Sequence, residues 1–233
     1  MGAAISSSSA NQKILEAARQ KMSTDQNLNL KTATFALGCF WHSDATFGCQ
    51  KGVHFTRCGY TSGTLPNPTY RNLGDHTEAV EVDYDPTETN FKTLLNHFWN
   101  SHDPTELHKR QYRSAVFYRD SEEQNIACES KKEIEGKIGR SVATAIEAFD
   151  KFYNAEDYHQ KYFLQTHHKA LFKSLGIKQQ DLVNSTLAAK LNGYIVGENS
   201  LEAFDAECKS LGLTADNIAY IRKEVAKGKQ GHC

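Results

Sequence analysis

The sequence lacks the features that would place it in a specialised class of protein. Its formal net charge is only −1 at pH 7 and its pI is about 6.8, so neither nucleic acid nor an anionic membrane is expected as the main partner. No apolar run approaches the roughly 20 residues that span a bilayer. The N-terminus also lacks the apolar stretch of a secretory signal. We therefore predict a cytoplasmic protein.

Closely spaced cysteine pairs are also absent, which argues against a metal site of the C-x2-C kind. The chain has 233 residues and no secretory signal, so a disulfide framework is not expected either. Most of the thiols should be free, and any disulfide should be transient and catalytic. The six cysteines are Cys39, Cys49, Cys58, Cys128, Cys208 and Cys233.

The first residues, Met1 to Ser6, fit the short pattern for N-myristoylation of Gly2. A start rich in small residues also arises by chance, so both interpretations stay open. A single myristoyl chain binds membranes only marginally and reversibly. The sequence therefore predicts no stable membrane insertion, and at most weak anchoring through Gly2.

The pattern of apolar residues predicts an α+β fold. Hydrophobic residues make up 39% and charged residues 24%, as in ordinary globular proteins. The order of elements resembles a ferredoxin-like split β-α-β two-layer sandwich, with an extended helical and coil C-terminal region. We divide the chain into a peripheral, partly disordered segment 1–30, a catalytic domain 31–195 and a helical extension 196–233. Predicted strands are 32–37, 52–60, 78–84, 112–118 and 142–148; helices are 39–50, one around 91–98, and three with N-caps at Ser121, Ser200 and Thr214.

Cys39 lies where the first predicted strand turns into a helix. The positive end of the helix dipole and its free N–H groups favour a thiolate over a thiol, so the position suits a reactive cysteine. A buried structural cysteine is the alternative. Phe40 and Trp41 follow directly and would line such a site with apolar surface, although either could be an ordinary core residue.

Gly38-Cys39-Phe40-Trp41 resembles the signature of the peptide methionine sulfoxide reductase A family. Further blocks resemble the family in the same order, and together the matches span roughly residues 32–195. They are 59–70, 74–80, 83–86, 98–104, 111–114, 152–160 and 192–194.

This resemblance implies reduction of methionine-S-sulfoxide, free or in proteins, without a metal or organic cofactor. Cys39 would attack the sulfoxide sulfur, and Glu78 would donate the proton that lets the oxygen leave. For Glu78, a solvated strand carboxylate is the alternative. Tyr60 and Tyr112 would hydrogen-bond the sulfoxide oxygen.

The resemblance also implies that Phe40 and Trp41 hold the terminal methyl group of the substrate. Cys39 would be left as a sulfenic acid, which a second thiol must convert to a disulfide. The partners implied are oxidised proteins and free methionine sulfoxide as substrates and thioredoxin as reductant. Such an activity would serve antioxidant repair.

The chain departs from the family at the position of the second thiol. Many members have a cysteine directly after the Asn-Gly-Tyr block, where this chain has Ile195. We predict that Cys233 takes its place, because a terminal cysteine behind Gly228 and Gly231 can approach Cys39 closely enough for a disulfide. Cys208 is the alternative.

A second departure lies before Tyr112. Many members have an aspartate five residues before this tyrosine, and Leu107 stands at that offset here. Asp103 or Glu106 could replace it. After the tryptophan, Asp44 stands in place of a longer glutamate.

Two rival hypotheses remain. The first is a cysteine hydrolase or acyltransferase, which would need His76 or His159 within hydrogen-bond reach of the Cys39 sulfur. The second is a redox sensor or binding module that keeps the fold but has lost turnover.

Overall fold

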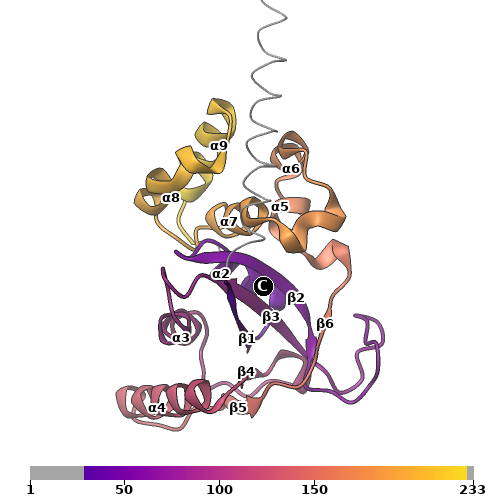
Figure 1. Cartoon of the computed structure of the whole chain (residues 1–233), viewed down its shortest axis with the longest axis vertical. Coiled ribbons are helices and arrows are strands. Elements are labelled where there is room, and N and C mark those ends of the chain that lie inside the picture. Colours follow the sequence, from indigo (N-terminus) through magenta and orange to yellow (C-terminus); the bar gives the residue numbers. More distant parts are fainter. Residues whose placement is uncertain (1–28, 230–233) are drawn as a thin grey trace, which may run out of the picture.

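The computed structural model describes residues 29–229, and it contains one six-stranded sheet in that range (Figure 1). The order of the strands is β5-β4-β1-β3-β2-β6; β4 and β5 are parallel, and the other neighbours are antiparallel. The strands are β1 (Lys31–Leu37), β2 (Val53–Thr61), β3 (Thr77–Tyr84), β4 (Ser114–Tyr118), β5 (Ala145–Ala148) and β6 (Phe152–Asn154). The inner order β4-β1-β3-β2 is that of a split β-α-β unit, so the predicted fold class is confirmed.

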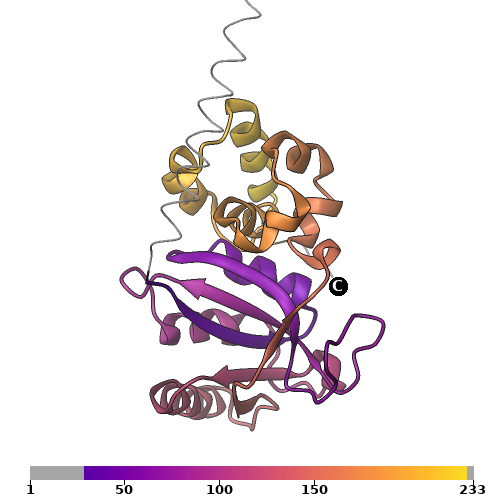
Figure 2. The same cartoon turned by 45° about the vertical axis from the view of Figure 1, so that its right-hand side comes forward.

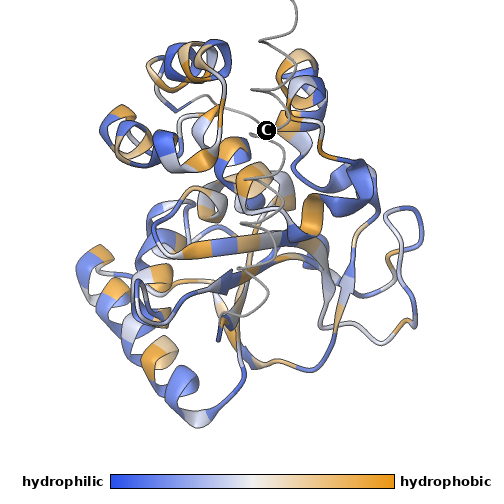
Figure 3. Ribbon diagram, turned by 45° about the horizontal axis from the view of Figure 1, so that its top comes forward, coloured by the Kyte–Doolittle hydropathy of each residue, from blue (hydrophilic) through white to orange (hydrophobic). Residues whose placement is uncertain are grey.

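One face of the sheet is covered by three helices, α2 (Phe40–Gly48), α3 (Phe91–Asn100) and α4 (Ser121–Ile138). Alternate residues of the strands, such as Phe35 and Val82, meet Phe47 of α2 and Phe98 of α3 in this core. Hydrophilic and hydrophobic residues alternate along α4 (Figure 3), as expected of a helix with only one face turned to the core.

The C-terminal helices form a separate layer against α2 (Figures 1 and 2). Ala45 and Cys49 of α2 pack in its core with residues such as Leu191, Phe204 and Ile221. The helix α2 therefore lies between two cores. The elements of this layer are α5 (Tyr162–Thr166), α6 (Lys169–Leu175), η3 (Gln179–Asn184), α7 (Thr186–Tyr194), α8 (Leu201–Glu207), η4 (Cys208–Leu211) and α9 (Ala215–Val225).

Two glycines let α2 and α7 approach each other closely. A Cβ atom on Gly48 would lie 2.3 Å from the carbonyl oxygen of Ala189, and one on Gly193 would lie 2.5 Å from the carbonyl oxygen of Ala45. Neither position has room for a side chain. The Asn-Gly-Tyr block therefore has a packing role at the helix that begins after Cys39.

Some predicted boundaries are wrong. The N-cap of α4 is Asp120, not Ser121, because the Asp120 backbone is extended and its carboxylate accepts a hydrogen bond from the Glu123 amide. The strand predicted at 112 begins at Ser114, and a 3-10 turn, η1 (Arg110–Tyr112), precedes it. The caps predicted at Ser200 and Thr214 are confirmed.

Candidate active site

Cys39 is the N-cap residue of α2 and is half-buried. Its carbonyl accepts hydrogen bonds from the amides of His42 and Ser43, at 3.1 and 3.3 Å. Gly38, which ends the approach from β1, has a φ of +93°, a conformation that glycine adopts without strain. The sulfur therefore lies at the strand-to-helix turn expected from the sequence.

Glu78 lies on β3 beside this turn, and it is 2% exposed. Its two carboxylate oxygens accept hydrogen bonds from the Phe40 amide at 3.2 Å and from the Gln111 side chain at 2.8 Å. Burial raises the pKa of Glu78, although both hydrogen bonds and the charge of Lys109 act in the opposite direction. Glu78 is thus not a solvated strand carboxylate.

Tyr60 and Tyr112 approach Glu78 from two elements. Tyr60 is buried on β2 directly opposite Glu78, and its hydroxyl donates to the Glu156 carboxylate at 2.9 Å. Tyr112 is half-buried at the end of η1, and its hydroxyl is hydrogen-bonded to Tyr70. Burial is the main cause that raises the pKa of both phenols, so both are hydrogen-bond donors at neutral pH.

Phe40 and Trp41 present aromatic surface next to Cys39. The Phe40 ring is buried against Tyr60 and His159, with centroid distances of 5.8 and 5.0 Å. The Trp41 indole stacks on Tyr162, with 3.7 Å between ring centroids and 4° between ring planes. Its N–H donates to Nδ1 of His159 at 3.0 Å.

The family model for peptide methionine sulfoxide reductase matches residues 31–191, which contain all of these side chains. A peptide methionine sulfoxide reductase of Drosophila melanogaster is 43% identical to the chain over 214 residues, which cover 90% of this chain and 87% of that relative. The chain belongs to the peptide methionine sulfoxide reductase family. The predicted class, an oxidoreductase acting on methionine sulfoxide, is confirmed at this level.

Other relatives of this reductase family agree with the match. The helical domain of selenoprotein methionine sulfoxide reductase A matches residues 176–226. Peptide methionine sulfoxide reductase A5 of Arabidopsis thaliana is 44% identical over 173 residues, 71% of this chain and 68% of the relative. The structure of methionine sulfoxide reductase A of Corynebacterium diphtheriae aligns with a TM-score of 0.56 and 31% identity, covering 59% of this chain and 76% of that chain.

Gln111 is a site residue of this reductase that the sequence reasoning missed. Leu107, at the offset of the family's aspartate, is 90% exposed. Asp103 accepts hydrogen bonds from Thr105 and Glu106 pairs with His108, so the replacement of that aspartate by either residue stays a prediction. The contact to Glu78 comes from Gln111, directly before Tyr112 in the Gln-Tyr-Arg-Ser block.

Replacing Gln111 with alanine is expected to raise the pKa of Glu78 further. The amide donates to the carboxylate, so its loss removes a contact that favours the ionised form. The carbon-13 chemical shift of the Glu78 carboxyl group, followed against pH by NMR, measures this change. Gln124→Ala is the matched control, because the hydrogen bond of that amide to the Tyr118 hydroxyl is exposed. An unchanged or lowered midpoint in Gln111→Ala would contradict the prediction.

A fully buried ion pair connects the elements behind the turn that carries Cys39. Lys161 and Asp44 are both 0% exposed, and 3.0 Å separates Nζ from Oδ1. Lys161 also donates to the Thr56 carbonyl, while Asp44 accepts from the Thr56 hydroxyl and from Asn192. The pair therefore joins α2, β2 and α7 behind the reactive turn.

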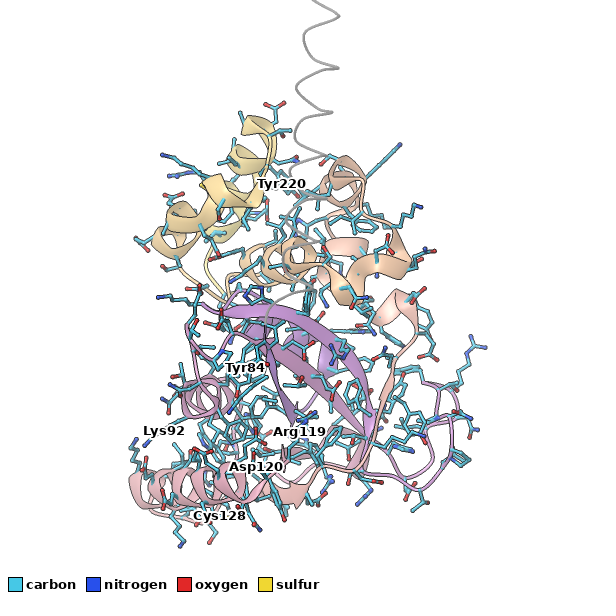
Figure 4. All side chains as sticks on the ribbon, viewed as in Figure 1. Tyr84, Lys92, Arg119, Asp120, Cys128 and Tyr220 are labelled. Carbon is cyan, nitrogen blue, oxygen red and sulfur yellow. The ribbon has the colours of Figure 1, made fainter. Side chains whose placement is uncertain are left out.

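The remaining cysteines differ in burial. Cys49 and Cys58 are buried, and burial raises the pKa of both thiols. Cys208 is 7% exposed, and its thiol lies 3.6 Å from the Asp205 carbonyl oxygen. Cys128 is half-buried on α4, at the opposite end of the molecule from Tyr220 of α9 (Figure 4). Cys233 lies outside the described residues.

The histidines needed by the hydrolase hypothesis have other surroundings. His76 is paired through Nε2 with the Leu65 carbonyl, and His159 through Nδ1 with Trp41. The other nitrogen of each ring makes no hydrogen bond within the described part of the chain, so neither histidine bonds the Cys39 sulfur. Among residues 29–229 there is also no group of three or more His, Cys, Asp or Glu side chains that could hold a metal ion.

A cavity of about 510 Å³ lies at the other end of α2 from Cys39. Cys49, Lys190, Tyr194 and Glu207 are among its lining residues, and none of the predicted site residues within 29–229 lines it. The cavity lies at the C-terminal end of α2 and is therefore separate from Cys39 and the residues around it.

Proposed function

We propose that this chain reduces the S epimer of methionine sulfoxide, free or in proteins, with Cys39 as the nucleophile. One observation carries the proposal: within a member of this family, Glu78 of β3 is buried beside the first turn of α2 and accepts a hydrogen bond from the Phe40 amide, next to Cys39. A sulfur nucleophile and a carboxyl group of raised pKa are thus held at one helix terminus.

In the proposed reaction the Cys39 thiolate attacks the sulfoxide sulfur, and the oxygen is transferred to the cysteine. Protonated Glu78 donates to the oxygen as the sulfur–oxygen double bond is lost. The products are methionine and a sulfenic acid on Cys39. Tyr60 and Tyr112 stabilise the developing charge on oxygen as neutral phenol donors.

Phe40 and Trp41 supply the apolar contact for the methyl group of the substrate. The support for this role is their place beside Cys39, together with the fixed orientation of the indole between Tyr162 and His159. A pocket of this kind selects by size, because one methylene group in an apolar site changes specificity by about 10–200-fold.

The sulfenic acid is resolved by Cys233, which forms a disulfide with Cys39 and releases water. The burial of Cys49, Cys58 and Cys208 leaves these thiols poorly placed for the role. A dithiol of thioredoxin then reduces the disulfide by thiol exchange. Cys208 remains the alternative resolving thiol.

The test is a single turnover with methionine-S-sulfoxide and no added reductant, counting methionine formed and thiols lost. The wild type is expected to form about one methionine per chain and to lose two thiols. Cys233→Ser should form the same methionine but no disulfide at Cys39, while the matched control Cys128→Ser should behave as the wild type. A Cys39 disulfide that persists in Cys233→Ser would assign resolution to another thiol, with Cys208→Ser as the next variant. A wild type that forms no methionine would overturn the proposed function.

Location and domain boundaries stay predictions. No helix among residues 29–229 is long and apolar enough to cross a membrane. The cytoplasmic location and the division at residues 30 and 195 are not tested by the structure. Gly2, the segment 1–28 with its predicted disorder, and residues 230–233 lie outside the described residues.

A further inference from the structure

The backbone that follows α9 packs directly on the loop that follows α7. Gly228 has a φ of +73° and turns the chain after α9, and a Cβ atom on Gly197 would lie 2.4 Å from the Gly228 carbonyl oxygen. Position 197 therefore has no room for a side chain. Close to this contact, Val196 and Val225 are buried in the core of the C-terminal layer. The segment that leads out of α9 is thus held against the loop after α7.

A buried carboxylate lies next to this contact. Glu198 directly follows Gly197, its side chain is 5% exposed, and its amide donates to the Gly193 carbonyl at 3.2 Å. Oε2 of Glu198 accepts from Nζ of Lys229 at 3.1 Å, and Oε1 lies 3.5 Å from Nε2 of His42. One carboxylate therefore contacts both the segment after α9 and the first turn of α2.

His42 belongs to the turn that carries the candidate nucleophile. Its amide donates to the carbonyl of Cys39 at 3.1 Å, so the two residues lie within one helical turn. On the other side of Glu198, Lys229 precedes Cys233 by four residues, which is a reach of about 14 Å for an extended chain. The pair of Glu198 and Lys229 thus ties the start of that reach to the turn of Cys39.

We propose that Glu198 is a positioning residue for resolution: it binds Lys229 and keeps the chain that follows close to the first turn of α2. The inference rests on the proposed function, since it needs Cys233 as the resolving thiol. The benefit is a higher effective concentration of the Cys233 thiol at the sulfenic acid of Cys39. The role does not require Glu198 to touch either sulfur.

The resolving step is balanced without another reactant. The Cys233 sulfur attacks the Cys39 sulfur, an S–S bond forms, and the S–O bond of the sulfenic acid breaks. The oxygen leaves as water and takes the proton of the thiol. The Cys39 sulfur is reduced and the Cys233 sulfur is oxidised, so the step needs a close approach of the two chain segments and nothing else.

The loop after α7 is also the place where many family members carry their second thiol. Ile195, which stands at that position here, is 0% exposed in the core of the C-terminal layer. Glu198 follows it three residues later, at the same end of α7. In this chain the loop therefore supplies an anchor for the segment of the second thiol, and not the thiol itself.

Lys229→Glu tests the anchor, because it turns an attraction to Glu198 into a repulsion at a side chain that is 49% exposed. In a single turnover with methionine-S-sulfoxide, dimedone at a fixed concentration competes with resolution for the sulfenic acid. Mass spectrometry then gives the ratio of the Cys39 disulfide to the Cys39 adduct, which does not depend on the rate of methionine formation. This ratio should fall roughly 3–10-fold in Lys229→Glu, and the yield of methionine should stay that of the wild type. Lys229→Arg keeps the charge and should keep the wild-type ratio.

Three controls separate the anchor from a general effect of charge or folding. Lys227→Glu makes the same change of charge two residues earlier, at a side chain that is 50% exposed and pairs with Glu224, and should leave the ratio unchanged. Lys229→Gln should lower the ratio in the wild type but cause little further loss in the Glu198→Gln background. High salt should lower the ratio in the wild type and not in Lys229→Gln, because salt screens exposed charges.

The outcomes distinguish this inference from the proposed function. A wild type that forms methionine and the disulfide of Cys233, with the same ratio in Lys229→Glu, would overturn the anchor and leave the proposed function intact. An equal fall in Lys227→Glu would assign the effect to the charge of the segment and would also overturn the anchor. Wild-type disulfide formation in Cys233→Ser would remove the resolving role and this inference with it, while a wild type that forms no methionine would remove the proposed function as a whole.

Discussion

Glu78→Gln is expected to slow methionine formation in a single turnover by about 10²–10⁴-fold, the usual contribution of a general acid. Glutamine keeps the size of the side chain and can still meet the Phe40 amide and Gln111, but it has no acidic proton to give. The measurement is rapid-quench formation of methionine from methionine-S-sulfoxide. Glu129→Gln, on the exposed face of α4, is the matched control and should keep the wild-type rate.

The rate of methionine formation should also depend on pH in a direction that the pKa of Glu78 determines. The pKa of Glu78 is raised, and the active form is the protonated one, so the rate limited by proton donation should fall as pH rises through that pKa. In Glu78→Gln this alkaline limb should disappear while any limb due to ionisation of Cys39 stays. A variant that keeps both the rate and the alkaline limb would show that another group donates the proton.

Lys161→Met is expected to destabilise the fold by about 3–5 kcal/mol, because it leaves the buried Asp44 carboxylate without its cation. The free energy of unfolding in urea measures the loss. The double variant Asp44→Leu/Lys161→Met removes both charges and should recover much of the stability. Arg222→Ala is the control: it breaks the pair with Asp205, whose two side chains are 47% and 36% exposed, and should cost at most about 1 kcal/mol.

Equal stability of Lys161→Met and the wild type would mean that the carboxylate finds other partners or a proton at small cost. A double variant as unstable as the single one would instead point to a packing defect at the junction of α2, β2 and α7. In either case the ion pair would lose the supporting role that its burial indicates.

The parts of the site close together in sequence could be predicted, and those joined across long separations could not. Cys39 was placed correctly because the apolar strand pattern ends at Gly38 and a helix follows directly. The resemblance to the family, not the pattern, assigned a role to Glu78. Lys161 carries no such signal: lysine is almost never fully buried without a partner, and its partner Asp44 lies 117 residues earlier in the chain.

The boundary errors have local causes. Asp120 and Ser121 both suit an N-cap, and only the extended backbone of Asp120 decides between them. The predicted strand includes Tyr112 and Arg113 because the apolar run of β4 follows them. In the structure, Arg110 donates to the Asp75 carbonyl, and Arg113 donates to the hydroxyls of Thr77 and Ser62. These contacts hold the 3-10 turn that brings Gln111 to Glu78. The periodicity of apolar residues in the sequence does not indicate them.

The hydrogen bonds of Tyr60 and Tyr112 have a consequence for product release. The Tyr60 hydroxyl donates to the Glu156 carboxylate, and the Tyr112 hydroxyl is hydrogen-bonded to the Tyr70 side chain. A sulfoxide oxygen is a strong acceptor and can compete for these protons, whereas the thioether sulfur of methionine is only a weak one. In the proposed reaction, both hydroxyls would return to these internal partners once the oxygen has left, and the product would lose the polar contacts that held the substrate. The resting hydrogen bonds of the site would then favour release of methionine over its rebinding.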